Sequence, residues 1–524
     1  MLWSRRHVTA LSAVLIVIFV FYIGQKQSPE TVVSLLSQPD IRLVHWERET
    51  DIYEQANLIS PVGKSRSSQL HLLIPATKPN RQLCRAVVSS LLLGYPVPVI
   101  NGWNLTDEFD AAVSHLAKVR NIMRYLDGLP SSADDDLVLI IDGYDAFMHL
   151  PAEIMIKRYF EITNAANAKL EERFGKGSTK PVPGGDQPQQ TILFGGDKVC
   201  WPVDWRRPGC WIVPSDTGIP EGTFGNVDGN LVHNQPRWLN SGTIIGPVGD
   251  MRLMFAATME RIRIDYDPNY DHSESDQMYM SDIWGDQEYA RAVRELKLKQ
   301  KETDGEPIPV GGPPDRFLPV LSPRQRTEYH IAIEYESALF QTRSGYDDFL
   351  DFPVFDGPDY TTLVERDTSG QPGFVPYTIK IPADVVASLT RLFKSIAGIH
   401  NLPSAPAKLI AQLKIGANLA TKQIYAVFHC TGGKLYLDKL WPTMWYYPYA
   451  ESLLRVAIRD GVRGKPVSER IDGRVWTAAH TYPASTKDDM GFKAAGAWAD
   501  LAGDWLDWGV LCGPDEAAIF EGRV

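Results

Sequence analysis

Cysteine is scarce in this chain of 524 residues, which contains only five: Cys84, Cys200, Cys210, Cys430 and Cys512. No two of them have the C-x-x-C spacing, which excludes zinc ribbons and thioredoxin-like redox sites, and five are too few for a scaffold built on disulfides. Long basic blocks are absent too, and 53 Lys and Arg against 64 Asp and Glu give a net charge of −11. A protein that binds nucleic acid through its phosphates is therefore disfavoured, and no nucleic-acid partner is expected.

Hydrophobic runs long enough to cross a membrane are missing except near the N-terminus. Val8 to Gly24 (VTALSAVLIVIFVFYIG) contains no charged residue. At about 1.5 Å per helical residue this run spans about 26 Å, enough to cross a thin bilayer once. A cleavable signal peptide is the alternative, but no small-residue cleavage site stands out after the run, so we expect a retained anchor. Arg5 and Arg6 place residues 1–7 in the cytosol by the positive-inside rule.

Composition divides the rest of the chain into three parts. Residues 25–65 are polar and contain Ser and Pro, as expected of a stem. Residues 66–449 form the predicted main folded domain, with insertions expected at about 301–324 and 345–420. Residues 450–524 contain four tryptophans and are expected to pack on that domain as a C-terminal extension.

This layout is typical of a single-pass type II protein of the Golgi or ER membrane, with its folded domain in the lumen. One N-x-S/T sequon, Asn104-Leu105-Thr106, occurs in the sequence. It follows a Gly-Trp pair, a position that suits an exposed loop.

Apolar strands alternate with helices from Leu70 onward. Strands are predicted over residues 70–75, 97–100 and 137–141, and helices over residues 82–93, 106–126, 383–398 and 409–421. Because the strands are continuously apolar, they favour an α/β fold with a Rossmann-like parallel sheet that helices cover on both faces. Ligands of such sheets bind beyond the carboxyl ends of the strands, so a site is expected just after Ile141.

The sequence IDGYD places two carboxylates, Asp142 and Asp145, directly after the apolar strand. Carboxylates three residues apart at a strand end can converge on one Mg²⁺ or Mn²⁺ ion, which keeps coordination positions open for phosphate oxygens. A solvated turn with an Asx hydrogen bond is the alternative, because D-x-x-D alone is a weak motif. The position after a buried strand strengthens the interpretation as a metal site.

Four other residues could contribute to the same site, and each has a structural alternative. Trp201 in CWPVDW could stack on a sugar ring or belong to the core. Asn240 in RWLNSGTIIG could bind sugar hydroxyls, or the segment could be only a turn. Asp276 in SDQMYM could be functional or cap the helix that follows it. His429 in HCTGGK could approach a ligand or be a structural histidine.

Taken together, these segments resemble the glycosyltransferase domain found at the N-terminus of lysyl hydroxylases, the procollagen-lysine dioxygenases. The resemblance covers about residues 70–350 and resumes near residues 425–445. Its motifs in this chain are AKVR with Lys118, IDGYD, CWPVDW, RWLNSGTIIG, SDQMYM, ESALFQ and HCTGGK. Their common order and spacing are more specific than any one motif.

The resemblance implies a GT-A-like fold that binds a UDP-sugar through Mn²⁺ or Mg²⁺ and transfers a hexose to a hydroxyl of a protein or glycan acceptor. It makes Asp142, Asp145 and His429 the metal ligands. It makes Asp276 the catalytic carboxylate, with Glu274 as a possible helper. The remaining matched residues are Lys118 near the nucleotide, Tyr144 at the uridine, Trp201 and Asn240 on the sugar and acceptor side, and Gly432 in the closing segment.

The chain also departs from the family's pattern. Where the family has a run of Asp before its Asp-Gln, this chain has SESDQ, and the family's His-Gly-Asn-Gly is replaced by HCTG. The insertion at residues 345–420 is foreign to the pattern. Residues 450–524 are too few for the family's iron-dependent dioxygenase, so hydroxylation is not expected. These departures keep open a second class, a membrane-anchored luminal binding module without transfer activity, although retention of all three metal-ligand residues favours the enzyme.

Overall fold

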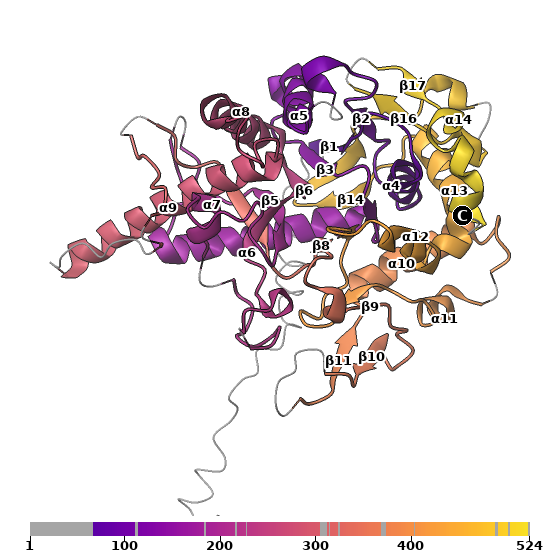
Figure 1. Ribbon diagram of the computed structural model, residues 1–524. Helices are drawn as coiled ribbons and strands as arrows, with labels where there is room; N and C mark the ends of the chain where they lie inside the picture. The colour runs from indigo at the N-terminus through magenta and orange to yellow at the C-terminus, as the bar shows by residue number, and fades with distance from the viewer. Residues whose placement is uncertain are drawn as a thin grey trace, which may run out of the picture. The chain divides into compact units, whose positions relative to one another are not determined.

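The computed structural model describes residues 66–521, except residues 111–113, 183–184, 215–216, 227, 304–311, 314, 323–324, 368–373, 403, 488–490 and 501–502. It is a mixed α/β structure with one large, mostly parallel sheet (Figure 1), which confirms the α/β class and the Rossmann-like sheet expected from the sequence. The predicted cytosolic tail, anchor at residues 8–24 and stem at residues 25–65 lie outside the described residues. Within the described residues, no helix is both long enough and apolar enough to span a membrane.

The large sheet has ten strands. They are β1 (Arg66–Pro75), β2 (Val99–Asn101), β3 (Leu137–Ile141), β5 (Ile192–Asp197), β6 (Trp238–Pro247), β7 (Ile331–Glu334), β14 (Ser468–Ile471), β15 (Arg474–Ala478), β16 (Ala497–Ala499) and β17 (Trp505–Leu506). Their order is β17-β16-β2-β1-β3-β6-β5-β7, and β15 pairs with the first half of β1 and with β14. β16, β2, β1 and β3 run parallel, whereas β6 runs antiparallel to its neighbours β3 and β5.

Smaller strands, α-helices and short 3₁₀ helices are the other regular elements of the described part of the chain. The strands are β4 (Ala146–Met148), β8 (Phe340–Thr342), β9 (Leu350–Asp351), β10 (Thr361–Val364), β11 (Tyr377–Lys380), β12 (Ala417–Asn418) and β13 (Val427–His429). The helices are α4 (Arg81–Leu92), α5 (Ala117–Gly128), α6 (Ala152–Phe174), α7 (Pro208–Trp211), α8 (Val248–Asp265), α9 (Asp276–Thr303), α10 (Ala383–Ile396), α11 (Pro406–Ile410), α12 (Tyr436–Leu440), α13 (Ala450–Val462), α14 (Trp508–Leu511) and α15 (Glu516–Phe520).

Strand β3 shows why helices cover both faces of the large sheet. All of its residues are buried, and alternate side chains enter two different cores. Leu137, Leu139 and Ile141 belong to the core that contains α4 and α6, whereas Val138 and Ile140 belong to the core that contains α5, α8 and α9. A continuously apolar strand is stable in such a doubly covered position. The chain leaves this buried environment directly after Ile141.

A three-stranded sheet brings a late segment of the chain to the end of β3. β13 lies between β4 and β8, antiparallel to β4 and parallel to β8. The register pairs His429 with Ala146, the residue that follows Asp145. The backbone N–H of Cys430 also donates to the carbonyl of Asp145, over 2.8 Å. Backbone pairing therefore sets the position of His429 relative to the IDGYD turn.

The C-terminal segment supplies strands to the large sheet itself. β15 pairs with residues 66–70 of β1, and β16 pairs with β2. A disulfide joins Cys84 on α4 to Cys512, just after α14. A second disulfide joins Cys200 to Cys210, and Cys430 is buried and free. Residues 450–521 thus pair with the first strands of the domain in addition to packing against it.

Two predicted helices differ from the structure. The helix predicted over residues 106–126 begins only at Ala117, and Asp107 near its predicted start has a φ of +58°, outside the helical region. The helix predicted over residues 409–421 ends at Ile410, and β12 follows it and pairs with β9. Between them, a Cβ on Gly416 would lie 2.1 Å from the Tyr425 hydroxyl oxygen. Tertiary packing at this point therefore overrides the helical periodicity of the sequence.

Candidate metal centre

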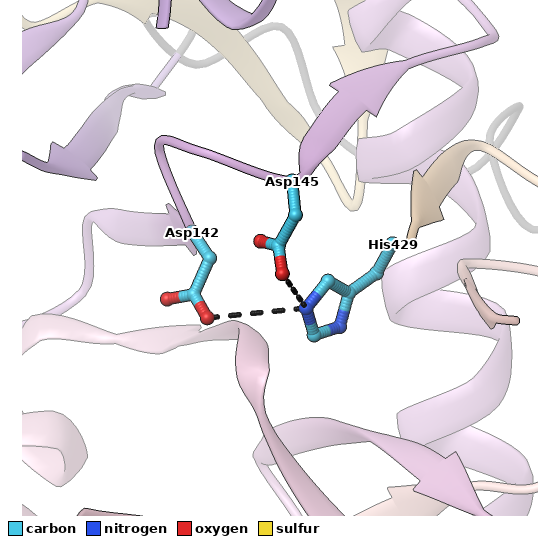
Figure 2. Close-up of side chains that lie close together, drawn as sticks. All are labelled: Asp142, Asp145 and His429. Carbon is cyan, nitrogen blue, oxygen red and sulfur yellow. Dashed lines mark ion pairs between the residues drawn. The ribbon is translucent and has the colours of Figure 1, made fainter. Parts of the chain in front are cut away.

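Three side chains from two distant parts of the chain point toward one another beyond the end of β3 (Figure 2). Asp142 follows β3, Asp145 precedes β4, and His429 ends β13. The Nε2 atom of His429 lies 3.4 Å from Asp145 Oδ2 and 3.9 Å from Asp142 Oδ2. One ligand atom from each residue lies within 4.8 Å of the other two. Carboxylate oxygens and an imidazole nitrogen are a donor set that suits Mn²⁺, and the carboxylates also suit Mg²⁺.

Burial and charge act in opposite directions on these groups. Burial raises the pKa of Asp145, but the neighbouring His429 and Lys434 outweigh it and hold the pKa at about 2. Burial lowers the pKa of His429, but the carboxylates of Asp145 and Asp142 outweigh it, so that the pKa rises. Asp145 is therefore ionised at neutral pH and attracts a cation.

Gly242 on β6 provides the space in which the imidazole ring lies. The ring of His429 packs so closely on this glycine that a Cβ atom would overlap it. The carbonyl of Gly242 also accepts a hydrogen bond from the backbone N–H of Asp142, over 2.9 Å. Nδ1 of His429 is buried and has no hydrogen-bond partner among the described residues, so its polar neighbours lie on the Nε2 side.

Lys118 on α5 connects two of the predicted site residues. Its ammonium group lies 2.7 Å from Asp142 Oδ1 and 3.1 Å from Asp276 Oδ2, and it donates to the carbonyl of Ser241 over 3.0 Å. Only 11% of the side chain is exposed. Burial lowers the pKa of Lys118, but the two carboxylates outweigh it and raise the pKa. Lys118 therefore holds Asp276, the first residue of α9, close to Asp142.

Lys434 is the second cation at the centre. Its ammonium group forms an ion pair with Asp145 Oδ2, the same oxygen that faces His429, and donates to the carbonyl of Cys430 over 3.0 Å. Unlike Lys118, its side chain is 53% exposed. Lys434 thus reaches Asp145 from the surface, whereas Lys118 belongs to the interior.

Asn240 lies in a buried polar network with Asp197, the last residue of β5. Its Nδ2 donates to Asp197 Oδ2 over 2.8 Å, and its Oδ1 accepts from the backbone N–H of Gly242 over 3.0 Å. Gln277 accepts a hydrogen bond from the backbone N–H of Ser241. Asp197 Oδ1 is buried without a hydrogen-bond partner among the described residues. Burial raises the pKa of Asp197, and the hydrogen bond from Asn240 opposes this rise.

Tyr144 and Trp201 are the two aromatic residues predicted at the site. The Tyr144 hydroxyl contacts three backbone groups: the N–H of Thr77, the N–H of Lys78 and the carbonyl of Lys78, each at 3.0 Å. Trp201 is 51% exposed and lies in the segment after β5. Its carbonyl accepts a long hydrogen bond from Gln277, over 3.4 Å, which ties this segment to the start of α9.

Glu274 and Gly432 contact residues other than the three metal-ligand residues. The two carboxylate oxygens of Glu274 accept hydrogen bonds from Ser114 and Tyr266, and not from Lys118. Gly432 has a φ of +82°, and a Cβ there would lie 2.9 Å from the Ser344 hydroxyl oxygen. It therefore shapes the turn between His429 and Lys434.

Three residues of the site were not predicted: Asp197, Gly242 and Lys434. Asp197 could have been predicted from the sequence. It ends the apolar segment ILFGGD with a carboxylate, just as Asp142 ends LVLIID. Gly242 and Lys434 lie within quoted motifs, but nothing in the sequence shows that His429 packs on the first or that the second reaches Asp145. A scan against protein-family models and a search of curated proteins find no match to this chain.

Proposed function

We propose that this chain is a metal-dependent glycosyltransferase with a GT-A-like fold, which transfers a hexose from a UDP-sugar to a hydroxyl of a protein or glycan acceptor in the Golgi or ER lumen. The proposal rests chiefly on one observation, the convergence of Asp142, Asp145 and His429 at a strand end. This edge of an α/β sheet is where nucleotides commonly bind. Likeness to the lysyl hydroxylase glycosyltransferase domain supports the choice of donor.

Asp142, Asp145 and His429 would hold a Mn²⁺ or Mg²⁺ ion. When bound, the cation supplies a Lewis acid for the diphosphate of the donor. The register of β13 orients His429, and Gly242 leaves room for its ring. Lys118 holds Asp142 from the interior and neutralises part of the charge that the two carboxylates concentrate there.

Tyr144 would bind the uridine. Its hydroxyl is already held by backbone groups of Thr77 and Lys78, so its ring has a fixed direction before any ligand arrives. An aromatic ring held at its polar end can stack on a flat base without losing further freedom. This contact would orient the nucleoside relative to the metal centre.

The acceptor side would be formed by residues after β5 and at the start of α9. An oxygen of Asp276 would accept the proton of the attacking hydroxyl. Asp197 would bind a sugar hydroxyl through Oδ1, which has no partner among the described residues, and Asn240 fixes this carboxylate from the other side. Trp201 would offer an exposed ring to an acceptor or sugar. Glu274, bonded to Ser114 and Tyr266, would act only by positioning the segment before Asp276.

The test is UDP release and sugar transfer by the purified chain with a panel of UDP-sugars, first with Mn²⁺ and then with a chelator. Transfer from one donor should require the metal. It should be lost in Asp145→Asn and His429→Ala, while the variant Asp127→Asn, an exposed carboxylate on α5, should retain it. Mn²⁺ binding by the same variants shows whether the loss arises at the metal.

Transfer that persists in both site variants would overturn the assignment of the metal ligands. A folded wild-type protein that binds Mn²⁺ and UDP, but transfers no sugar to any acceptor in a glycan and peptide panel, would instead identify a binding module. These outcomes separate the two classes because metal binding alone is common to both.

A further inference from the structure

The sequon Asn104-Leu105-Thr106 lies in a turn just after β2. Asn104 has a φ of +51° and Gly102 a φ of +96°, so the chain turns sharply here. Asn104 and Thr106 are both exposed. Asparagine is among the residues that most readily adopt a positive φ, which explains its presence at this position without any role for its amide.

Backbone contacts hold the turn and leave the Asn104 side chain uncommitted. The backbone N–H of Asn104 donates to the carbonyl of Thr77 over 3.1 Å, and that of Leu105 donates to the carbonyl of Gly102 over 3.4 Å. The Thr106 hydroxyl donates to Asp107 over 3.0 Å at the surface. No described residue forms a hydrogen bond with the Asn104 side-chain amide. A large group attached to that nitrogen would therefore displace no contact of the fold.

The two disulfides are an independent indication of the compartment. Cys84–Cys512 and Cys200–Cys210 together use four of the five cysteines, and such bridges persist in the secretory pathway but are rare in the cytosol. The disulfides therefore indicate that the described domain lies in the lumen, where N-glycosylation takes place. The positive-inside orientation of residues 1–24 predicts the same side of the membrane.

We propose that Asn104 carries an N-linked oligosaccharide. The donor class is a lipid-linked oligosaccharide diphosphate of the secretory pathway. The side-chain amide nitrogen of Asn104 forms a bond to the anomeric carbon of the first sugar and gives up one proton to solvent, while the bond from that carbon to the lipid diphosphate breaks and the diphosphate leaves with the electron pair. This inference does not rest on the proposed transferase activity.

The position of Asn104 leaves the predicted acceptor side accessible. In the sheet order, β2 lies on one side of β3 and β5 on the other, so Asn104 after β2 and Trp201 after β5 flank the metal centre from opposite sides. Thr77 links Asn104 to the donor side, because its N–H donates to the Tyr144 hydroxyl and its carbonyl accepts from Asn104. An oligosaccharide on Asn104 would thus lie near Tyr144, on the side of the metal centre opposite Trp201.

The experiment expresses the full chain in a eukaryotic secretory cell line and compares its mobility before and after treatment with an N-glycan-releasing enzyme. The wild type should show a shift equal to one oligosaccharide. The shift should vanish in Asn104→Gln and in Thr106→Ala and persist in Thr106→Ser, which keeps the sequon. Asn269→Gln, an exposed asparagine outside any sequon, is the matched control and should shift like the wild type.

Non-reducing electrophoresis and secretion of an anchor-deleted form show whether each variant folds. A wild type without a shift overturns the proposal, as does a shift that survives in Asn104→Gln. Loss of the shift in Thr106→Ser as well as Thr106→Ala, with both proteins folded, would contradict a sequon-dependent modification. The transferase assay is unaffected by any of these results, so the two proposals fail separately.

Discussion

A Cβ atom on residue 242 would lie 2.0 Å from Cε1 and 2.6 Å from Nε2 of His429, so only glycine allows the imidazole its position. We expect Gly242→Ala to push the ring away from the carboxylates and to weaken Mn²⁺ binding by about 10- to 100-fold, as is typical when the support of a metal ligand is lost. Titration monitored by electron paramagnetic resonance of Mn²⁺ measures this effect.

Gly433→Ala is the matched control for this substitution. Gly433 belongs to the turn after His429, but a Cβ there would contact nothing within 4 Å. Its Mn²⁺ affinity should equal that of the wild type. Equal weakening in both variants would show that the turn, and not the packing of His429 on β6, governs the centre.

Removal of Lys434 is expected to strengthen metal binding in the absence of nucleotide. The Lys434 ammonium and a metal ion compete for Asp145 Oδ2, and Lys434 reaches this oxygen from the surface. Lys434→Gln should raise the Mn²⁺ affinity about two- to fivefold. This corresponds to the free energy of a partly exposed ion pair, about 0.5–1 kcal/mol, which the metal no longer has to displace. Lys439→Gln on α12, also exposed, should change nothing. Unchanged binding in Lys434→Gln would mean that the ion pair gives way to the metal without cost, and weaker binding would mean that Lys434 supports the centre.

Asp197 offers a test of the acceptor and sugar side that leaves the three metal-ligand residues in place. Asp197→Asn can still accept the hydrogen bond from Asn240, but it places an amide group where Oδ1 now has no partner. The transfer rate should fall by about 10- to 100-fold, because the sugar hydroxyl loses one hydrogen bond to a charged group. Mn²⁺ affinity should change less than transfer, because Asp197 acts on His429 through its charge and is not one of the three metal-ligand residues. Glu221→Gln, an exposed residue in the same connection between β5 and β6, should transfer normally.

The Cys84–Cys512 disulfide should contribute strongly to stability, because it closes a loop of 428 residues between α4 and the end of the chain. The double variant Cys84→Ser, Cys512→Ser should lose about 2–5 kcal/mol of unfolding free energy in urea titrations. The double variant Cys200→Ser, Cys210→Ser removes a bridge between residues only 10 positions apart. Its loss of unfolding free energy should therefore be smaller. The reverse order would show that strain or residual structure, and not loop closure, dominates.

His149 predicts a dependence of stability on pH. Its Nε2 accepts the backbone N–H of Gly416 over 2.9 Å and must therefore be unprotonated. Burial, assisted by the charge of Arg158, lowers its pKa to about 3, compared with 6.5 in the unfolded chain. As the pH falls from 6.5 toward 3, the unfolded chain binds a proton that the folded chain does not, so the unfolding free energy decreases.

The variant His149→Gln keeps an oxygen that can accept the Gly416 N–H and removes the titration. Its unfolding free energy, from urea titrations at several pH values, should fall less steeply below pH 6.5 than that of the wild type. His115→Gln, at an exposed position, should follow the wild-type curve. A parallel curve for His149→Gln would assign the acid sensitivity to other groups.

Three neighbouring strands of the large sheet, β1, β2 and β3, were predicted because they depend on local patterns. β3 reads as a continuously apolar strand, and its doubly covered position follows from that pattern alone. Asp142 and Asp145 were predictable for the same reason, since a strand end fixes where their backbone emerges. The helix expected over residues 409–421 was wrong because the close approach of Gly416 to Tyr425 joins two segments whose contact no periodicity reveals.

The sequence by itself determined the α/β class, the two carboxylates at the end of β3, and an isolated histidine in a glycine-rich segment. The family resemblance grouped His429 with those carboxylates, but only the tertiary structure shows how it reaches them, through the pairing of β13 with β4 and β8. It also decided that Lys434 lies on Asp145, that Asp197 keeps an oxygen beside Asn240 with no hydrogen-bond partner among the described residues, and that the C-terminal strands pair with β1 and β2. Apolar periodicity acts over a few residues and can be read locally, whereas contacts between distant segments depend on strand register and close packing throughout the domain.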